Sequence, residues 1–518
     1  MRQHSPAILT GFLLLVIGYP AFAEEKDAGT PKKAPEMAES EHRVIYNLDC
    51  TEYFVGSFGP VVPETIDKFV DDHGAAGITD LFINVNAQRT NYRSKVWEAW
   101  WDGYDPALGI DQPFFAGIPE KRRNGPDAND AQMYINMLKL HEGGCDYAKR
   151  MIDRARRNQV KPWISLRMND GHEQGNREHP SHSTIWKSHP QWRLAYGLDY
   201  EQPEVRKHQM KLVREVCFRY DLDGLELDFE RFWLYFRAGR EHEGVKLMTA
   251  FLEETRQATE GAAKRLGHPV KLAVRVPSSP WIARRHGLDA VVWAKAGLVD
   301  LIIASPFWFS ANSDIPVETW KGLLIGTGCE VAFSLEDALN SGASGRRTMT
   351  HEEMRGVLTS GLHRGADAVY FFNLFTGPYH TWPRKDYNRL MKDAGSYKTL
   401  SDNPRRHALT ITAPWSAGEP RPASLLPHTG KHGAFRLHIG PKPRTKQHAR
   451  IELKLPDSAF TPDVKLNGIL CSKPVKPLEQ GQRYIYDVPA SAVSEGYNLV
   501  EVIAEKEIEI TWVEISIR

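Results

Sequence analysis

Residues 223–230 read DGLELDFE, and three of their four acidic residues alternate with apolar residues. In a β-strand, successive side chains point to opposite faces, so we expect Glu226, Asp228 and Glu230 to share one face. Burying like-charged carboxylates costs free energy unless they share protons or pair with cations, and their repulsion raises the pKa of one of them. A carboxyl group that stays protonated near neutral pH can act as a general acid, so the pattern predicts glycosidase chemistry. Structural ion pairs with arginines are the alternative.

The same segment is similar to the DGxDxDxE signature on the fourth strand of family 18 glycoside hydrolases. That resemblance implies that the last acid, Glu230, is the acid/base. The chain departs from the family in having Glu226 where the signature has its middle Asp, and in reading IIASPFWF over residues 302–309, without the family's Met-x-Tyr-Asp. Residues 43–400 as a whole look more like the glycosyl-hydrolase-like (family 10-like) barrels of exported bacterial proteins, which implies a barrel fold and names no substrate.

A second resemblance concerns the partner acid. Many retaining glycosidase barrels carry the acid/base at the end of the fourth strand and the nucleophile at the end of the seventh, which here matches Glu230 or Asp228 and Glu336. The resemblance implies that Glu230 is the acid/base, that Asp228 tunes or assists it, and that Glu336 is the nucleophile or base. A cap on the following helix is the alternative for Glu336. We expect Glu230→Gln and Asp228→Asn to reduce hydrolysis by orders of magnitude without lowering thermal stability.

Eight runs rich in β-branched and aromatic residues alternate with segments of helical periodicity, and Thr350-x-x-Glu353 predicts a capping box that opens one helix. This alternation favours a parallel sheet with right-handed crossovers, and eight units in roughly 350 residues predict a (β/α)8 TIM barrel. An open doubly wound sheet is the alternative, but residues 50–54 (CTEYF) are not its Gly-rich loop. The predicted strands are 44–48, 80–85, 161–166, 224–229, 271–276, 301–304, 331–335 and 369–372.

Polar side chains follow most of these strands, on the face where a barrel builds its active site. We predict that they bind substrate, although an Asn or Asp after a strand is often a turn residue or a helix cap. Guanidinium groups match carboxylate and sulfate geometry, so the arginines suggest an anionic (uronic or sulfated) carbohydrate, with pairing to the fourth-strand acids as the competing explanation. The predicted binding residues are Glu226, Asp49, Asn84, Asn86, Arg89, Arg167, Asn169, Asp170, Arg231, Arg275 and Asn373.

Aromatic residues gather in the loop after the second strand, over residues 92–115, which include Trp100 and Trp101. Flat apolar faces beside polar groups hold pyranose rings, so we predict that these two tryptophans and Trp308, after the sixth strand, stack on sugar. A long insertion that packs on itself is the alternative.

Four histidines after the third strand, including His172 and His182, suggest a metal-dependent hydrolase or deacetylase as a second enzyme hypothesis. It requires His172, His182 and Asp170 to converge on one ion, and the spacing instead favours solvated loop histidines with no metal or cofactor. A third hypothesis is a non-catalytic glycan-binding barrel, in which Glu230→Gln leaves function intact.

The two ends of the chain differ from the barrel segment, 43–402. An apolar run over residues 8–17 and the Ala-Phe-Ala at 21–23 predict a cleaved signal peptide, 1–23, and hence a secreted or periplasmic protein without a membrane-spanning segment after cleavage. Residues 24–42 lack large apolar side chains and predict a disordered spacer. Residues 403–518, with Pro- and Gly-rich turns between short alternating runs, predict a β-sandwich or jelly-roll-like domain.

The amino-acid composition excludes some classes of partner and of site. The chain has 518 residues, and 66 Lys+Arg against 65 Asp+Glu give a formal net charge of +1, so nothing global indicates a nucleic-acid partner. Because the net charge is near zero, any preference of this protein for a charged ligand must come from a local group of residues. Five scattered cysteines do not make a disulfide scaffold or a zinc site.

Overall fold

The computed structural model describes residues 41–56, 58–125, 129–307, 310–340, 346–376, 382–410, 426–456, 461–473 and 483–518. The predicted signal peptide, nearly all of the predicted spacer and Trp308 lie outside these residues. Within the described part of the chain, no helix is both long and apolar enough to span a bilayer.

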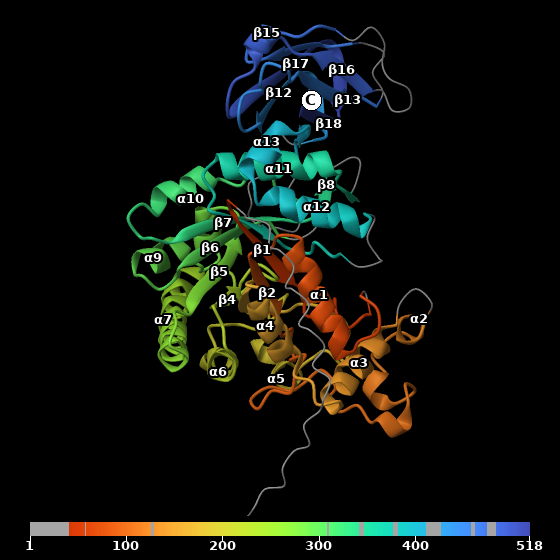
Figure 1. Cartoon of the computed structure of the whole chain (residues 1–518), viewed down its shortest axis with the longest axis vertical. Coiled ribbons are helices and arrows are strands. Elements are labelled where there is room, and N and C mark those ends of the chain that lie inside the picture. Colours follow the sequence, from red (N-terminus) through yellow and green to blue (C-terminus); the bar gives the residue numbers. More distant parts are fainter. Residues whose placement is uncertain are drawn as a thin grey trace, which may run out of the picture. The chain divides into compact units, whose positions relative to one another are not determined.

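Parallel strands close into an eight-stranded barrel, which confirms the predicted TIM-barrel architecture (Figure 1). Around the barrel the order is β1-β10-β7-β6-β5-β4-β3-β2, so every strand pairs with its neighbours in the chain's strand–helix alternation. Each strand starts and ends within one residue of its prediction, because hydrophobic runs buried on both faces are readable from sequence. The bounds are β1 Arg43–Leu48, β2 Asp80–Asn84, β3 Lys161–Arg167, β4 Gly224–Asp228, β5 Lys271–Pro277, β6 Leu301–Ser305, β7 Glu330–Leu335 and β10 Ala368–Phe371.

Helices surround the barrel, and further short elements lie in the loops after β2, β3 and β7 (Figure 1). The predicted capping box opens α11: Thr350 Oγ accepts from the Glu353 N–H, and the Glu353 carboxylate accepts from the Thr350 N–H at 2.8 Å. The helices are α1 Pro63–Ala75, α2 Glu120–Arg123, α3 Asp130–Glu142, α4 Tyr147–Arg157, α5 Thr184–Ser188, α6 Pro203–Arg219, α7 Glu241–Leu266, α8 Pro280–Arg285, α9 Ala290–Lys295, α10 Val317–Leu323, α11 His351–His363, α12 Arg384–Ala394 and α13 Tyr397–Asp402. A small hairpin, β8 Ala338–Asn340 with β9 Arg346–Thr348, follows β7.

The barrel interior changes from apolar to polar along the strands. Trp163 of β3 belongs to an apolar cluster inside the barrel. The next inward positions of β3 are Ser165 and Arg167, whose register partners on β4 are Glu226 and Asp228. Because side chains alternate along a strand, this register brings charged groups together at the carboxyl end of the barrel.

The C-terminal region is all β, as predicted, and has its own hydrophobic core. Two four-stranded antiparallel sheets, β11-β18-β13-β16 and β12-β17-β14-β15, contribute to that core, which is the arrangement of a sandwich. The domain boundary at residue 402 stays a prediction. The strands are β11 Arg405–Ala408, β12 His428–His438, β13 Ala449–Lys454, β14 Asp463–Leu466, β15 Ile469–Leu470, β16 Arg483–Asp487, β17 Tyr497–Ile510 and β18 Trp512–Ile517.

Candidate active site

The fourth strand has the orientation that its sequence predicts. Its apolar residues belong to the core between the barrel and the helices. Its first two acids point inward, and Asp228 and Glu230 are each only 2% exposed. Glu230 follows the end of β4, so it lies at the carboxyl end of the barrel, where this fold carries its chemistry.

Glu226 is the deepest of the three acids. Its carboxyl group accepts a hydrogen bond from the Tyr370 hydroxyl at 2.7 Å and one from the Asn47 amide at 3.5 Å, so it connects β4 with β10 and β1 across the interior. Burial and the charge of Asp228 raise the pKa of Glu226 to about 8. Glu226 therefore keeps its proton at neutral pH.

Asp228 is fixed by a cation from the neighbouring strand. Arg275 Nε donates to its Oδ1 at 2.9 Å, and the Glu230 N–H donates to the same oxygen at 3.0 Å. The guanidinium is held in turn by the Ser305 hydroxyl at 2.9 Å and lies 3.7 Å from the centroid of the Phe372 ring. The two inward acids of β4 therefore have different environments, one carboxyl protonated and one paired with a cation.

A second charged network joins the ends of β1 and β3. Arg167 donates to Asp49 and, at 2.9 Å, to Asp170, whose other oxygen lies 2.9 Å from Nδ1 of His172. Burial alone would raise the pKa of both carboxyls, but the neighbouring groups outweigh it. Arg167 and Arg231 hold the pKa of Asp49 well below its usual range, and contacts with His172 and Arg167 do so for Asp170. Three strand-end arginines, Arg167, Arg231 and Arg275, thus pair with acids of the chain, which favours the structural explanation over an anionic substrate.

Glu336 and Asn373 complete the ring of polar strand ends. The Asn373 amide donates to Glu336 at 3.4 Å, and its oxygen accepts from Arg231 at 3.4 Å. Asn373 thus connects the residue after Glu230 with the end of β7. The alternative that Glu336 caps a following helix is wrong, because β8 follows it and Thr350 caps the next helix.

Four of the predicted binding residues donate side-chain hydrogen bonds to backbone carbonyl oxygens. The Asn84 and Asn86 amides donate to β3 carbonyl oxygens at 3.0 Å, Asn169 donates to the Leu234 carbonyl at 2.7 Å, and Arg89 donates to that of Asp102 at 2.8 Å. These contacts position the loops around the site. Any direct contact of these four residues with substrate stays a prediction.

Trp100 and Trp101 lie in the core of the insertion after β2. Both are buried; Trp100 packs against Tyr134 with ring centroids 5.4 Å apart, and Trp101 stacks on His141 at 5.4 Å. Both partners belong to α3. This placement favours the alternative of an insertion that packs on itself over a sugar-stacking surface.

Sequence reasoning missed an aromatic pair that packs against His172. Tyr196, 45% exposed, stacks on Phe232 at 5.8 Å with an interplanar angle of 23°, and His172 meets Phe232 edge on at 5.1 Å. A Cβ atom on Gly171 would come within 2.9 Å of the Phe232 ring, so glycine allows this close packing. Phe232, two residues after Glu230, was visible in the sequence; Tyr196 was not, because it comes from the distant end of the loop after β3.

A buried carboxyl outside the barrel was also missed. Glu52, after β1, accepts from the Thr376 N–H at 3.2 Å and from the Tyr46 hydroxyl at 3.5 Å. Burial and the charge of Asp49 raise its pKa to about 8. Its position two residues before Phe54, in a turn, gave no pattern from which burial could be inferred.

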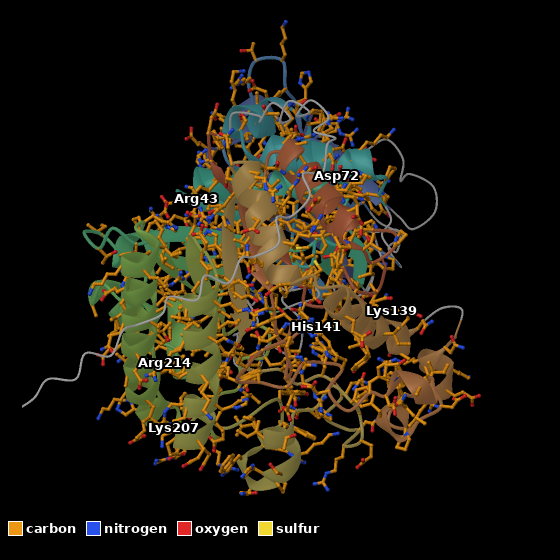
Figure 2. All side chains as sticks on the ribbon, turned by 60° about the horizontal axis from the view of Figure 1, so that its bottom comes forward. Arg43, Asp72, Lys139, His141, Lys207 and Arg214 are labelled. Carbon is orange, nitrogen blue, oxygen red and sulfur yellow. The ribbon has the colours of Figure 1, made fainter. Side chains whose placement is uncertain are left out.

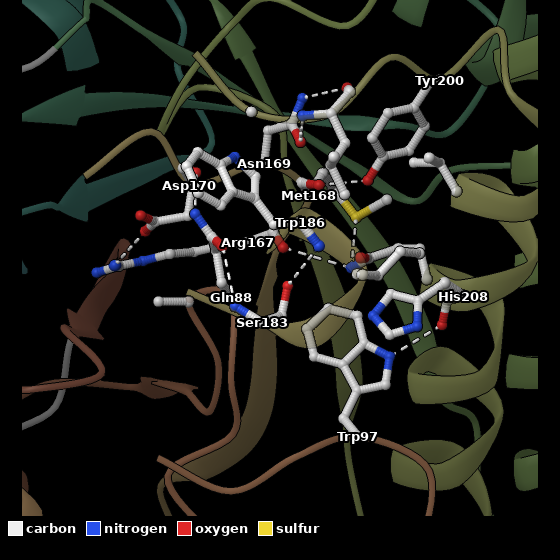
Figure 3. Close-up of a pocket in the computed structure, with 16 residues that line it drawn as sticks. Gln88, Trp97, Arg167, Met168, Asn169, Asp170, Ser183, Trp186, Tyr200 and His208 are labelled. Atoms are coloured by element: carbon white, nitrogen blue, oxygen red, sulfur yellow. Dashed lines mark hydrogen bonds and ion pairs between the residues drawn. The ribbon is translucent and has the colours of Figure 1, made fainter. Parts of the chain in front are cut away.

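A small cavity is lined in part by Arg167 and Asp170 (Figure 3). Its volume is about 30 Å³, room for about one water molecule and too little for a sugar ring. Trp97 and His208 form one side, stacked at 4.3 Å, with the indole N–H donating to the His208 carbonyl at 3.0 Å. The cavity therefore belongs to the packing of the loop after β3 and is not a substrate site.

The residues of the metal hypothesis do not converge. His182 Nε2 lies 3.0 Å from the carbonyl oxygens of Glu173 and Asn176, and its ring stacks on Trp186. Throughout the described ranges, no group of three or more His, Cys, Asp or Glu side chains is arranged to hold a metal ion. The geometry thus gives no support to a metal-dependent hydrolase.

Fold and site together define a (β/α)8 barrel whose carboxyl-end face carries a dense cluster of acids and arginines. No protein-family model and no curated protein matches the chain. The resemblance to family 18 and family 10-like glycoside hydrolases therefore stays a prediction from the fourth-strand motif.

Solved structures resemble the chain at low identity. They include the PgaB (BpsB) glycoside hydrolase domain from Bordetella bronchiseptica (12% identity, TM-score 0.40, 69% of this chain and 99% of that chain) and the chitinase ChiA74 from Bacillus thuringiensis (11%, 0.38, 92% and 100%). A cycloisomaltooligosaccharide glucanotransferase from Paenibacillus sp. matches at 8% identity and a TM-score of 0.32, over 92% of this chain and 57% of that chain. The chain spans little more than half of that enzyme. These values are too low to transfer an activity.

Proposed function

We propose that the chain is a glycoside hydrolase that cleaves glycosidic bonds of a polysaccharide or oligosaccharide by carboxylate acid/base catalysis. Glu230 is the acid/base, Asp228 orients it, and Glu336 is the nucleophile or base. The observation that supports this proposal best is the row of acids on β4 at the carboxyl end of the barrel: Asp228 is held by Arg275, and it binds the backbone N–H of Glu230. Glu226, deeper on the same strand, keeps a proton because burial and the charge of Asp228 raise its pKa to about 8. Buried carboxyl groups in different environments at this end of a barrel are typical of acid/base catalysis.

The contact between Asp228 and the backbone of Glu230 supports this division of roles. Because Arg275 and the Glu230 N–H bind the same Asp228 oxygen, the backbone that carries Glu230 is held at a defined position. Tyr196 is exposed and stacks on Phe232, two residues after Glu230, so it offers an aromatic surface suited to the C–H face of a pyranose ring. A carbohydrate substrate fits this combination, and the pairing of the arginines favours a neutral one. Export through the predicted signal peptide is part of the proposal.

The test is a hydrolysis screen of the full chain against neutral and anionic glycans, with newly formed reducing ends counted. We expect activity on at least one glycan and its loss, by about 10²- to 10⁴-fold, in Glu230→Gln. Absence of hydrolysis across the panel, or full activity of Glu230→Gln, would contradict the proposal.

A non-catalytic glycan-binding barrel is the second candidate. The burial of Asp228 and Glu230, each 2% exposed, favours it, since catalytic carboxyls must reach the substrate. It predicts that glycan binding, measured by calorimetry, is the same in the unmodified chain and in Glu230→Gln, and that neither cleaves the ligand.

A further inference from the structure

A basic groove runs between α6 and α7 on the outer wall of the barrel. We define it by Arg206, Lys207, Lys211 and Arg214 of α6 and by Glu254 of α7, and it has a volume of about 530 Å³. Its floor is apolar, made of Met210, Leu247, Ala250 and Phe251. It uses none of the acids on β4.

The cations of the groove form a row. Lys207, Lys211 and Arg214 are exposed and lie at positions i, i+4 and i+7, on one face of the helix, over about 10 Å of its axis. Figure 2 shows Lys207 and Arg214 projecting from the same helix. Like charges at this spacing repel one another, so the row weakens α6 unless an anion neutralises it.

Few of these charges are neutralised within the chain. Arg214 pairs with Glu254 at 3.2 Å, and Arg206 donates to the Tyr200 and Glu201 carbonyls. Across the part of the chain that the structure describes, the ammonium groups of Lys207 and Lys211 form no hydrogen bond and no ion pair, although both residues are exposed on α6. The two acids of α6 lie near its ends: Glu204 is exposed in the first turn, and Glu215 accepts from Tyr92 and Ser94 in the loop after β2.

We propose that this basic groove binds an acidic polysaccharide chain, with carboxylate or sulfate groups on the lysines and sugar C–H faces over the apolar floor. A compact anion needs converging donors, whereas a row of cations matches charges repeated along a chain. A groove of this volume accepts a narrow ligand. A bilayer surface is flat and cannot follow the floor between two helices, and the fixed negative charge of Glu254 opposes a wide polyanion.

Binding is measured with the full chain by calorimetry against polygalacturonate and dextran sulfate, with neutral dextran as the reference. We expect both anionic polymers to bind, with affinity that falls as salt rises, and Lys207→Gln/Lys211→Gln to weaken binding at least tenfold. The matched control is Lys385→Gln/Lys392→Gln, which removes the same charge from exposed positions of α12. Thermal melting confirms that both variants are folded.

Three outcomes would overturn the proposal. One is no binding of either anionic polymer. A second is an equal loss of affinity in the groove variant and the α12 control, which would indicate a nonspecific charge effect. The third is a groove-dependent association with vesicles containing phosphatidylglycerol and none with the polymers, which would assign the groove to a membrane surface. Because hydrolysis is not measured, none of these results depends on the proposed function.

Discussion

Arg275 of β5 holds Asp228 of β4 through a 2.9 Å contact between Nε and Oδ1, inside the barrel and shielded from water. Removing one partner of a buried ion pair leaves the other charge without compensation. We expect Arg275→Gln to lower the free energy of unfolding by about 3–5 kcal/mol, measured by chemical denaturation. Arg285→Gln, at an exposed position of α8, is the control and should change it little. Equal stability of the two variants would show that the pair does not stabilise the fold.

The same contact changes the expectation for Asp228→Asn. The sequence alone suggested that removing one of three adjacent acids would leave stability unchanged or raise it. Because Asp228 is the partner of Arg275, we now expect its neutralisation to lower the melting temperature, whereas Glu230→Gln should leave it nearly unchanged. Differential scanning calorimetry of both variants checks this, and a melting temperature of Asp228→Asn at or above that of the unmodified chain would contradict it.

Glu230→Gln should slow hydrolysis by about 10²- to 10⁴-fold, because it removes a group that transfers protons in the transition state. The loss should be smaller on an aryl glycoside, whose leaving group needs little protonation. Rates on a natural glycan and on the aryl glycoside, measured in parallel, separate an acid/base role from a general defect. An equal loss on both substrates would assign Glu230 a different role.

Two buried carboxyls, Glu226 and Glu52, have pKa values raised by burial to about 8 from an ordinary 4.5. Between these values the folded chain holds protons that the unfolded chain has released, so the free energy of unfolding falls as pH rises from about 4.5 to 8 and then levels off. Each group contributes on the order of 5 kcal/mol to that fall. Glu226→Gln and Glu52→Gln should each flatten the profile; Glu243→Gln, on the exposed face of α7, should not. A profile that rises over this range in the unmodified chain would contradict the assignment.

Tyr196→Ala should raise KM for an oligosaccharide about tenfold and leave kcat and the melting temperature nearly unchanged, since it removes an exposed stacking face worth about 1 kcal/mol or more. The matched control is Phe218→Ala, an exposed aromatic on α6 that is 77% accessible. A parallel fall in kcat would instead indicate that Tyr196 positions the acids.

The sequence by itself determined the strands and the faces of their side chains. A strand alternates with period two, so the inward direction of Glu226 and Asp228 followed from spacing alone, and the Thr350–Glu353 capping box followed from four consecutive residues. These are local properties, set by backbone geometry within a few residues. The predicted strand ends differ from the observed ones by one residue at most for the same reason.

Only the tertiary structure decided the partners. Arg275 and Asp228 are 47 positions apart, and nothing in either local sequence selects one arginine for one acid. The sequence predicted that Trp100 and Trp101 stack on sugar, but both pack against α3, whereas Tyr196 stacks on Phe232 from a distant part of the chain. The raised pKa of Glu226 likewise depends first on its burial, which the closure of the strands into a barrel produces, whereas the charge of Asp228 acts on it from the same strand. The spacing of residues determines the face of a strand on which each side chain lies. Side-chain contacts and burial instead arise from the packing of segments far apart in the chain.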